Sequence, residues 1–213
     1  MADSKLTTFY DRISDKYDLV MNLTGYTILS RLVFKKLPNR YTSPRILDLG
    51  CGTGITTRLI EEKFLNARIT ALDNSENMLN IYRKKFPENE VMLGDFNGEN
   101  GFYAYPGMKR APLPPGAFDI VVSVGAVLEY GIPDKVFSFI YDVLKTSGMA
   151  VIIGAKKSFF TDIVGTICWR YKLPDTREIL STIGQSGFRH ISCNGSGNRF
   201  PANFFKEIII AYK

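Results

Sequence analysis

A short glycine-rich segment constrains this chain more than any other feature of its sequence. Residues 46–54 read Ile-Leu-Asp-Leu-Gly-Cys-Gly-Thr-Gly, so an apolar run passes directly into three glycines at alternate positions. Glycine adopts backbone angles that other residues resist, and it lets a ligand approach the chain closely. The segment therefore predicts a strand, a ligand-binding turn and a helix. The spacing is GxGxG, because Ile55 stands where the dinucleotide-binding fingerprint GxGxxG has its last glycine.

The rest of the chain alternates strand-like and helix-like segments, which predicts a doubly wound α/β fold with a mostly parallel sheet. Seven strands are expected, at residues 45–49, 68–72, 90–93, 118–124, 149–154, 188–193 and 204–212. Helices are expected at residues 55–65, 75–85, 136–144 and 175–185, with Ser75 or Asn74 as the cap of the second and Asp175 as the cap of the last. The glycine- and asparagine-rich turn at 194–198 predicts a hairpin, so the last strand is expected to be antiparallel.

Three segments fall outside this alternation. Residues 1–40 contain two amphipathic stretches, which we interpret as a helical lid, and residues 97–117 and 156–174 are interpreted as inserted loops. Both loops follow strands of the predicted sheet at the carboxyl edge, where open α/β sheets bind their ligands. Long loops in such a fold are usually functional. We therefore interpret residues 1–213 as a single domain whose loops and lid surround one site.

Composition excludes several classes of protein. The chain has 213 residues, of which 45% are hydrophobic and 23% charged, as in ordinary globular domains. No apolar run reaches the roughly 18 residues of a membrane-spanning helix, and the first residues lack a secretory signal. Three cysteines without CxxC spacing and a single histidine, His190, predict reduced thiols, no metal site and a cytoplasmic location. The net charge of +6 comes from the two terminal parts, which gives weak support for an anionic partner.

Acidic residues mark the ends of the predicted strands. Asp73 ends the second strand, Asp95 ends the third, and Asp119 lies at the start of the fourth. A carboxylate at the position of Asp73 can accept hydrogen bonds from both hydroxyls of a ribose. Each aspartate alone is explained better as a helix cap or a hydrated loop residue than as a ligand-binding residue. Together with the glycine turn they favour a nucleoside-containing ligand.

This arrangement resembles the class I S-adenosylmethionine-dependent methyltransferases, which have a Rossmann-like fold, from Arg45 to the end of the chain. The resemblance implies S-adenosyl-L-methionine as cofactor and S-adenosyl-L-homocysteine as product. It implies that the glycine turn holds the methionine part, that Asp73 binds the ribose and that Asp95 binds the adenine. The residues that it places around the cofactor are Tyr10, Tyr17, Asp48, Gly50, Cys51, Gly52, Gly54, Asp73, Asn74, Met78, Gly94, Asp95, Phe96, Ser123 and Val124.

The N-terminal run Phe9–Leu19 narrows the resemblance. It is similar to the start of quinone C-methyltransferases and of bacterial phosphatidylethanolamine N-methyltransferases, in which this helix closes over the cofactor. The resemblance then implies that Tyr10 and Tyr17 line the pocket; packing of an amphipathic helix on the sheet explains them equally well. The basic, apolar face of this segment is also suited to peripheral contact with a membrane.

The expected reaction is methyl transfer to a small acceptor that is apolar or lipid-like. If the acceptor has to lose a proton, the candidates for catalysis are Tyr17, Glu129 and Tyr130, although Glu129 is explained slightly better as a solvated residue at a helix start. Two alternatives remain at this stage. The basic flanks alone favour an RNA methyltransferase, and a non-catalytic partner subunit that binds S-adenosyl-L-methionine has the same cofactor residues.

Overall fold

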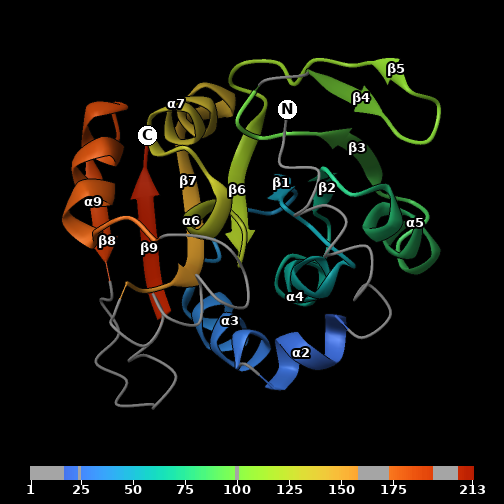
Figure 1. Cartoon of the computed structure of the whole chain (residues 1–213), viewed down its shortest axis with the longest axis horizontal. Helices are drawn as coiled ribbons and strands as arrows, with labels where there is room; N and C mark the ends of the chain where they lie inside the picture. The colour runs from blue at the N-terminus through green and yellow to red at the C-terminus, as the bar shows by residue number, and fades with distance from the viewer. Residues whose placement is uncertain (1–16, 24, 99–100, 158–172, 194–205) are drawn as a thin grey trace.

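Nine strands form one sheet in the part of the chain that the computed structural model describes, which is residues 17–23, 25–98, 101–157, 173–193 and 206–213 (Figure 1). The order of the strands across the sheet is β5-β4-β3-β2-β1-β6-β7-β9-β8. Their bounds are β1 Arg45–Leu49, β2 Arg68–Asp73, β3 Glu90–Gly94, β4 Phe102–Ala104, β5 Lys109–Arg110, β6 Phe118–Val124, β7 Leu144–Ala155, β8 His190–Cys193 and β9 Lys206–Tyr212.

The centre of the sheet is parallel and both ends are antiparallel. β1 pairs in parallel with β2 and β6, β2 with β3, and β6 with β7. β9 inserts between β7 and β8 and runs antiparallel to both, so the predicted antiparallel end of the sheet is confirmed. The mostly parallel α/β fold is confirmed as well.

The predicted count of seven strands is wrong. The two additional strands, β4 and β5, form an antiparallel hairpin on the free edge of β3, inside the segment that the sequence analysis interpreted as a loop. They contain three and two residues, which is too short for an alternating pattern to be recognised. The ring of Phe102 on β4 lies 5.3 Å from that of Phe139, so the hairpin is packed against the body of the domain.

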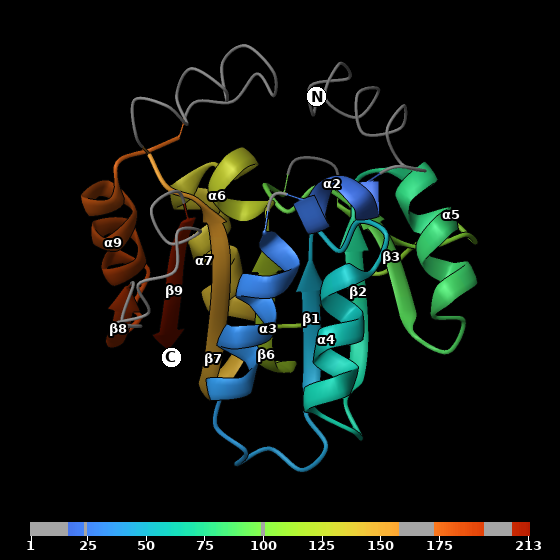
Figure 2. The ribbon, with the colours of Figure 1, turned by 90° about the horizontal axis from the view of Figure 1, so that it is seen from below.

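Helices cover both faces of the sheet (Figures 1 and 2). The bounds of the helices are α2 Tyr17–Leu23, α3 Tyr26–Lys36, α4 Ile55–Lys63, α5 Glu76–Lys85, α6 Val127–Tyr130, α7 Pro133–Val143 and α9 Thr176–Gln185. The predicted caps are present, because the side chain of Ser75 accepts a hydrogen bond from Met78 N and that of Asp175 accepts one from Arg177 N. Each cap satisfies a backbone donor that the first helical turn leaves free.

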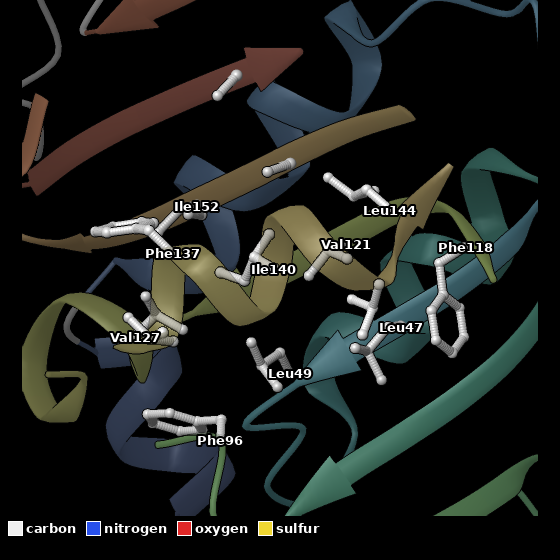
Figure 3. Close-up of a cluster of buried hydrophobic side chains, with 14 of the residues drawn as sticks. Leu47, Leu49, Phe96, Phe118, Val121, Val127, Phe137, Ile140, Leu144 and Ile152 are labelled. Atoms are coloured by element: carbon white, nitrogen blue, oxygen red, sulfur yellow. The ribbon is translucent and has the colours of Figure 1, made fainter. Parts of the chain in front are cut away.

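Alternating side chains of the strands build separate cores on the two faces. Leu47 and Val121 belong to the core beneath α7 and α9 (Figure 3), whereas their neighbours Ile46 and Ile120 belong to the core beneath α3 and α4. All four side chains are fully buried. A strand buried on both faces has no polar alternation, which is why these segments read as continuous apolar runs. The two cores fix the carboxyl ends of β1, β2 and β6 relative to one another, and the candidate site lies there.

Candidate functional site

The glycine turn after β1 has the backbone that its sequence predicts. Gly50, Gly52 and Gly54 have φ angles of 74°, 52° and 90°, all in the left-handed region. A Cβ on Gly50 would lie 2.3 Å from the Cβ of Ala126, which follows β6. No side chain fits in that space, so the two turns can lie together only because residue 50 is glycine.

A pocket opens between these turns and the end of β2. Its lining combines backbone from the two turns with one carboxylate, one carboxamide and three large side chains. The lining residues are Gly50, Gly52, Asp73, Asn74, Ser75, Met78, Phe96, Gly125, Ala126 and Tyr130. The structure thus brings together seven residues that the sequence analysis named: Gly50, Gly52, Asp73, Asn74, Met78, Phe96 and Tyr130.

Asp73 is held in a fixed orientation at the pocket. Its Oδ2 accepts a hydrogen bond from Gly52 N at 2.8 Å, and its Oδ1 accepts one from Ser75 N at 2.9 Å. A carboxylate oxygen accepts more than one hydrogen bond, so both oxygens keep capacity for a ligand. The carboxylate is therefore preorganised to receive a pair of neighbouring hydroxyl groups.

Asp48 is fully buried beneath the turn, outside the pocket lining. Its Oδ2 accepts a hydrogen bond from Thr57 Oγ1 at 2.5 Å, and its Oδ1 makes none. Burial raises the pKa of Asp48 from 3.8 to about 7; the bond from Thr57 lowers it and the charge of Asp73 raises it further. Cys51 is also buried, and burial raises the pKa of its thiol well above its usual value. A thiol in that state is a poor nucleophile, so Cys51 serves the turn through its backbone.

Two more predicted positions shape the turn and the strands around it. Gly54 is the N-cap of α4, and a Cβ there would lie 2.3 Å from the ring of Phe86. Gly94 ends β3, where a Cβ would lie 2.6 Å from the ring of Phe102 on the hairpin. Both glycines are required by close packing and lie outside the pocket lining.

Asp95 contributes to the site through the loop that it stabilises. Its side chain is buried, and Oδ1 accepts hydrogen bonds from the backbone N and the side-chain Nδ2 of Asn97. Asn97 in turn donates to the carbonyl of Tyr130 and accepts from Ile132 N. Asp95 thereby connects the loop after β3 to α6, and its neighbour Phe96 reaches the pocket.

After β6, the pocket is lined by Gly125 and Ala126 and not by the predicted Ser123 and Val124, which directly precede them. Ser123 is buried and accepts a hydrogen bond from Val127 N, and Val124 belongs to the core beneath α3 and α4. Gly125 and Ala126, with Ser75, are the lining residues that the list of candidates missed. Gly125 has a φ of 70°, and the only available signal for it was a glycine directly after a strand.

The three candidates for catalysis are placed differently. Tyr130 lines the pocket. Glu129 is 7% exposed, so its interpretation as a solvated residue at a helix start is wrong. Its Oε1 accepts hydrogen bonds from Tyr26 Oη at 2.7 Å and from Ala155 N at 2.6 Å. Tyr17 begins α2 but its side chain, like the whole of Tyr10, lies outside the described residues.

Asp119 does not belong to the site. It lies at the amino end of β6, on the opposite edge of the sheet, where it accepts hydrogen bonds from Arg45 N at 2.8 Å and from Lys145 Nζ at 2.8 Å. Parallel strands bring their carboxyl ends to one edge, so a residue that starts a strand cannot join residues that end one. Of the three acidic residues at strand ends, only Asp73 and Asp95 therefore lie at the edge of the sheet that carries the site.

Similarity to known proteins identifies the domain. Residues 46–148 match a family described as a methyltransferase domain. This part of the chain is a methyltransferase domain. A demethylmenaquinone methyltransferase of Thermotoga maritima is 27% identical over 146 residues, covering 68% of this chain and 58% of the relative. A rice 2-methyl-6-phytyl-1,4-hydroquinone methyltransferase is 27% identical over 199 residues, covering 90% and 56%. The chain thus spans little more than half the length of these relatives.

Solved structures agree with the fold of the methyltransferase domain. The phosphoethanolamine N-methyltransferase 2 of Haemonchus contortus, solved in complex with S-adenosyl-L-methionine, superposes with a TM-score of 0.67 at 18% identity, covering 87% of this chain and 52% of that chain. The resemblance inferred from the glycine turn and the strand ends is confirmed. In the described parts of the chain, no helix is long and apolar enough to span a membrane, and no three His, Cys, Asp or Glu side chains gather as metal ligands.

The buried carboxyl of Asp48 makes the stability of the methyltransferase domain dependent on pH. The pKa of this carboxyl is about 7 in the folded protein and 3.8 for an ordinary aspartate, so the folded state binds a proton more tightly. Stability therefore falls as the pH rises from 3.8 to about 7. D48N cannot titrate and keeps an oxygen for Thr57. We expect the stability of D48N relative to the wild type to increase between about pH 5 and pH 7, by at most about 1.4 kcal/mol per pH unit.

Urea unfolding followed by circular dichroism at a series of pH values measures this difference. D142N, which changes an exposed carboxyl on α7, serves as the control and should differ from the wild type by a constant amount. A constant difference for D48N as well would show that Asp48 is ionised over the whole range.

Proposed function

We propose that this protein transfers the methyl group of S-adenosyl-L-methionine to a small, apolar or lipid-like acceptor, releasing S-adenosyl-L-homocysteine. The observation that carries the proposal is the preorganised carboxylate of Asp73 beside a glycine turn that leaves no room for side chains. Relatives named for their action on demethylmenaquinone and on a phytylhydroquinone support the class of acceptor. Neither the geometry of the pocket nor these relatives favour the two alternatives, RNA methylation and a non-catalytic role.

The lining residues fit the cofactor part by part. Asp73 would accept the two ribose hydroxyls, and Asn74, Met78 and Phe96 would enclose the nucleoside. The open backbone of the turn from Gly50 to Gly54, with Asp48 beneath it, would receive the methionine part. The oxygen of Asp48 that has no hydrogen-bond partner lies under this turn, so it could accept a hydrogen bond from a donor group of a ligand.

The sulfonium of the cofactor supplies an activated methyl group when bound. The protein then has to align the acceptor with this methyl group and keep water away from both. Gly125, Ala126 and Tyr130 form the wall of the pocket next to the ends of β6 and β7, which is the side left open for an acceptor. Tyr130 and Glu129, with Tyr17, remain the candidates for contact with the acceptor.

Replacing Asp73 tests the assignment of the cofactor. D73A removes two charge-assisted hydrogen bonds to the ribose, each worth roughly 1.5–3 kcal/mol. We expect the affinity for S-adenosyl-L-homocysteine to fall at least about tenfold, because about 1.4 kcal/mol corresponds to one decade. Isothermal titration calorimetry measures the affinity, and NAD should bind poorly to the wild type because the last glycine of its fingerprint is missing.

D119A is a matched control for D73A. Asp119 also accepts a backbone hydrogen bond at a strand end, but at the opposite edge of the sheet, so its loss should leave the affinity unchanged. Tight binding of NAD without binding of S-adenosyl-L-homocysteine would refute the proposed cofactor. Equal affinities of folded D73A and the wild type would place the ribose elsewhere.

We further propose that the N-terminal part acts as a lid, and α2 supports this. Asp18 Oδ1 accepts a hydrogen bond from Thr53 Oγ1 in the glycine turn, and Asp18 Oδ2 accepts one from Lys85 Nζ at 2.7 Å. At the other end of α2, the methyl group of Met21 would lie 3.4 Å from a Cβ on Gly125. α2 therefore crosses the carboxyl edge of β1 between the two turns of the pocket (Figure 2).

Weakening this connection should speed the release of the cofactor product. D18N removes the charge that Thr53 and Lys85 bind, so we expect S-adenosyl-L-homocysteine to dissociate several-fold faster while the fold is kept. Stopped-flow displacement measures the rate. E62Q, which breaks the exposed Arg31–Glu62 ion pair between α3 and α4, is the control and should leave the rate unchanged. A D18N rate equal to that of the wild type would argue against a closing role for α2.

Exposed apolar side chains on α2 and α3 support the proposal that the protein makes peripheral contact with a membrane that carries the acceptor. Leu19 and Leu23 are 60% and 78% exposed on α2, and Ile28 on α3 is also exposed. We expect the protein to cosediment with vesicles of phosphatidylcholine and phosphatidylglycerol at low salt, and the variant L19S/L23S to bind less. L65S, which changes a leucine after α4 that is 89% exposed, should bind like the wild type. No cosedimentation at low salt would leave a freely diffusing acceptor as the proposal.

A further inference from the structure

A buried polar cluster lies behind the wall of the pocket. It consists of Tyr26 at the start of α3, Glu129 on α6 and Lys206 at the start of β9. Figure 2 shows α6, the start of α3 and the end of β7 at the edge toward which β1 points. The cluster and the pocket therefore share one edge of the sheet.

One oxygen of Glu129 has no partner. Oε1 accepts the two hydrogen bonds from Tyr26 and Ala155 described above, whereas Oε2 is buried and makes no hydrogen bond. Oε2 lies over the end of β7, where a Cβ on Gly154 would be 2.9 Å from it. Buried carboxylate oxygens in folded proteins are normally hydrogen-bonded, so an unpartnered one on the helix that supplies Tyr130 to the pocket points to a donor supplied by a bound molecule.

The other members of the cluster hold and tune this carboxyl group. Burial raises the pKa of Glu129, and the hydrogen bonds from Tyr26 and Ala155 and the charge of Lys206 oppose that rise. The ammonium of Lys206 lies 3.2 Å from the centroid of the Tyr26 ring, and burial lowers its pKa to about 8, with Glu129 opposing the shift. Among the described residues, Tyr26 from α3 and Lys206 from β9 are the titratable groups that act on Glu129, and β7 contributes the backbone N–H of Ala155.

The cluster lies on the acceptor side of the pocket. A Cβ on Gly125 would be 3.6 Å from Cε1 of Tyr26, and Glu129 directly precedes Tyr130, which lines the pocket. Asp73 places the ribose at the end of β2, two strands away from β6. An acceptor has to approach the methyl group from the other side, over the ends of β6 and β7. That is where Oε2 of Glu129 lies.

We propose that Glu129 is a catalytic base: its Oε2 accepts a hydrogen bond from a hydroxyl group of a phenol- or hydroquinone-type acceptor and removes that proton during methyl transfer. This inference rests on the proposed function. Tyr26 is a positioning residue that fixes the carboxylate through Oε1.

The step balances in atoms and in charge. The O–H bond of the acceptor breaks and its proton goes to Oε2. The electron pair left on the acceptor forms the new bond to the methyl carbon, and the carbon–sulfur bond breaks with its pair remaining on sulfur. A carboxylate and a sulfonium thereby become a neutral acid and a neutral thioether. Loss of both charges together is favoured in a buried site, where isolated charges are costly.

The test uses 1,4-dihydroxynaphthalene, kept reduced under anaerobic conditions, as the acceptor probe. Its affinity for the protein saturated with S-adenosyl-L-homocysteine is measured by calorimetry, and its methylation is measured with labelled S-adenosyl-L-methionine. E129Q keeps an oxygen for Tyr26 and Ala155 but cannot take a proton. We expect E129Q to bind the product like the wild type and to methylate the probe at least about a hundredfold more slowly. E178Q, an exposed glutamate on α9, should behave like the wild type.

The pH profile separates a base from a structural role. In the wild type, methylation should fall as the pH drops through the pKa of Glu129, and E129Q should lack this limb. Y26F removes a hydrogen bond that lowers the pKa of Glu129, so its acidic limb should move to higher pH with most activity kept. The base is refuted if E129Q methylates like the wild type, or if it loses affinity for S-adenosyl-L-homocysteine to the same degree as activity. Binding of the product without binding of the probe would overturn the hydroxyl subsite while leaving the cofactor assignment intact.

Discussion

The close approach of two turns, one after β1 and one after β6, is the constraint on which the rest of the site depends. Gly50 and Ala126 meet with no space for a side chain at position 50. The same turn is tied to β2, because the backbone N–H groups of Gly50 and Cys51 both donate to the carbonyl of Leu72. Three strand ends are thereby held together, and Asp73, which directly follows Leu72, takes its place in the pocket as a result.

Two buried carboxyl groups lie on either side of this junction. Asp48 lies beneath the turn after β1, and Glu129 lies behind the turn after β6; each has one oxygen that accepts hydrogen bonds and one that does not. Burial raises the pKa of both. Such groups cost stability, and a fold retains them most readily where a ligand or a reaction uses them. They lie on the two sides that the proposed function assigns to the cofactor and to the acceptor.

The sequence was most informative where a residue's role is set by its near neighbours. The turn from Gly50 to Gly54, the caps Ser75 and Asp175 and the central strands could be predicted, because local backbone geometry and apolar runs determine them. Asp119 was grouped with the site although its predicted place at the start of a parallel strand already puts it at the opposite edge from Asp73 and Asp95, which end their strands. The burial of Glu129 depends on Tyr26, 103 positions earlier in the chain, and no local pattern encodes such a contact.

The β4–β5 hairpin determines which strand forms the free edge at one end of the sheet. Without it, the free edge would be β3, whose unpaired backbone groups could receive a strand from another molecule. With it, the outermost strand is β5, which has two residues, Lys109 and Arg110, and both are exposed. A strand so short and so positively charged offers little for another chain to pair with. The insertion that lengthens the sheet thus also protects that edge from aggregation at high protein concentration.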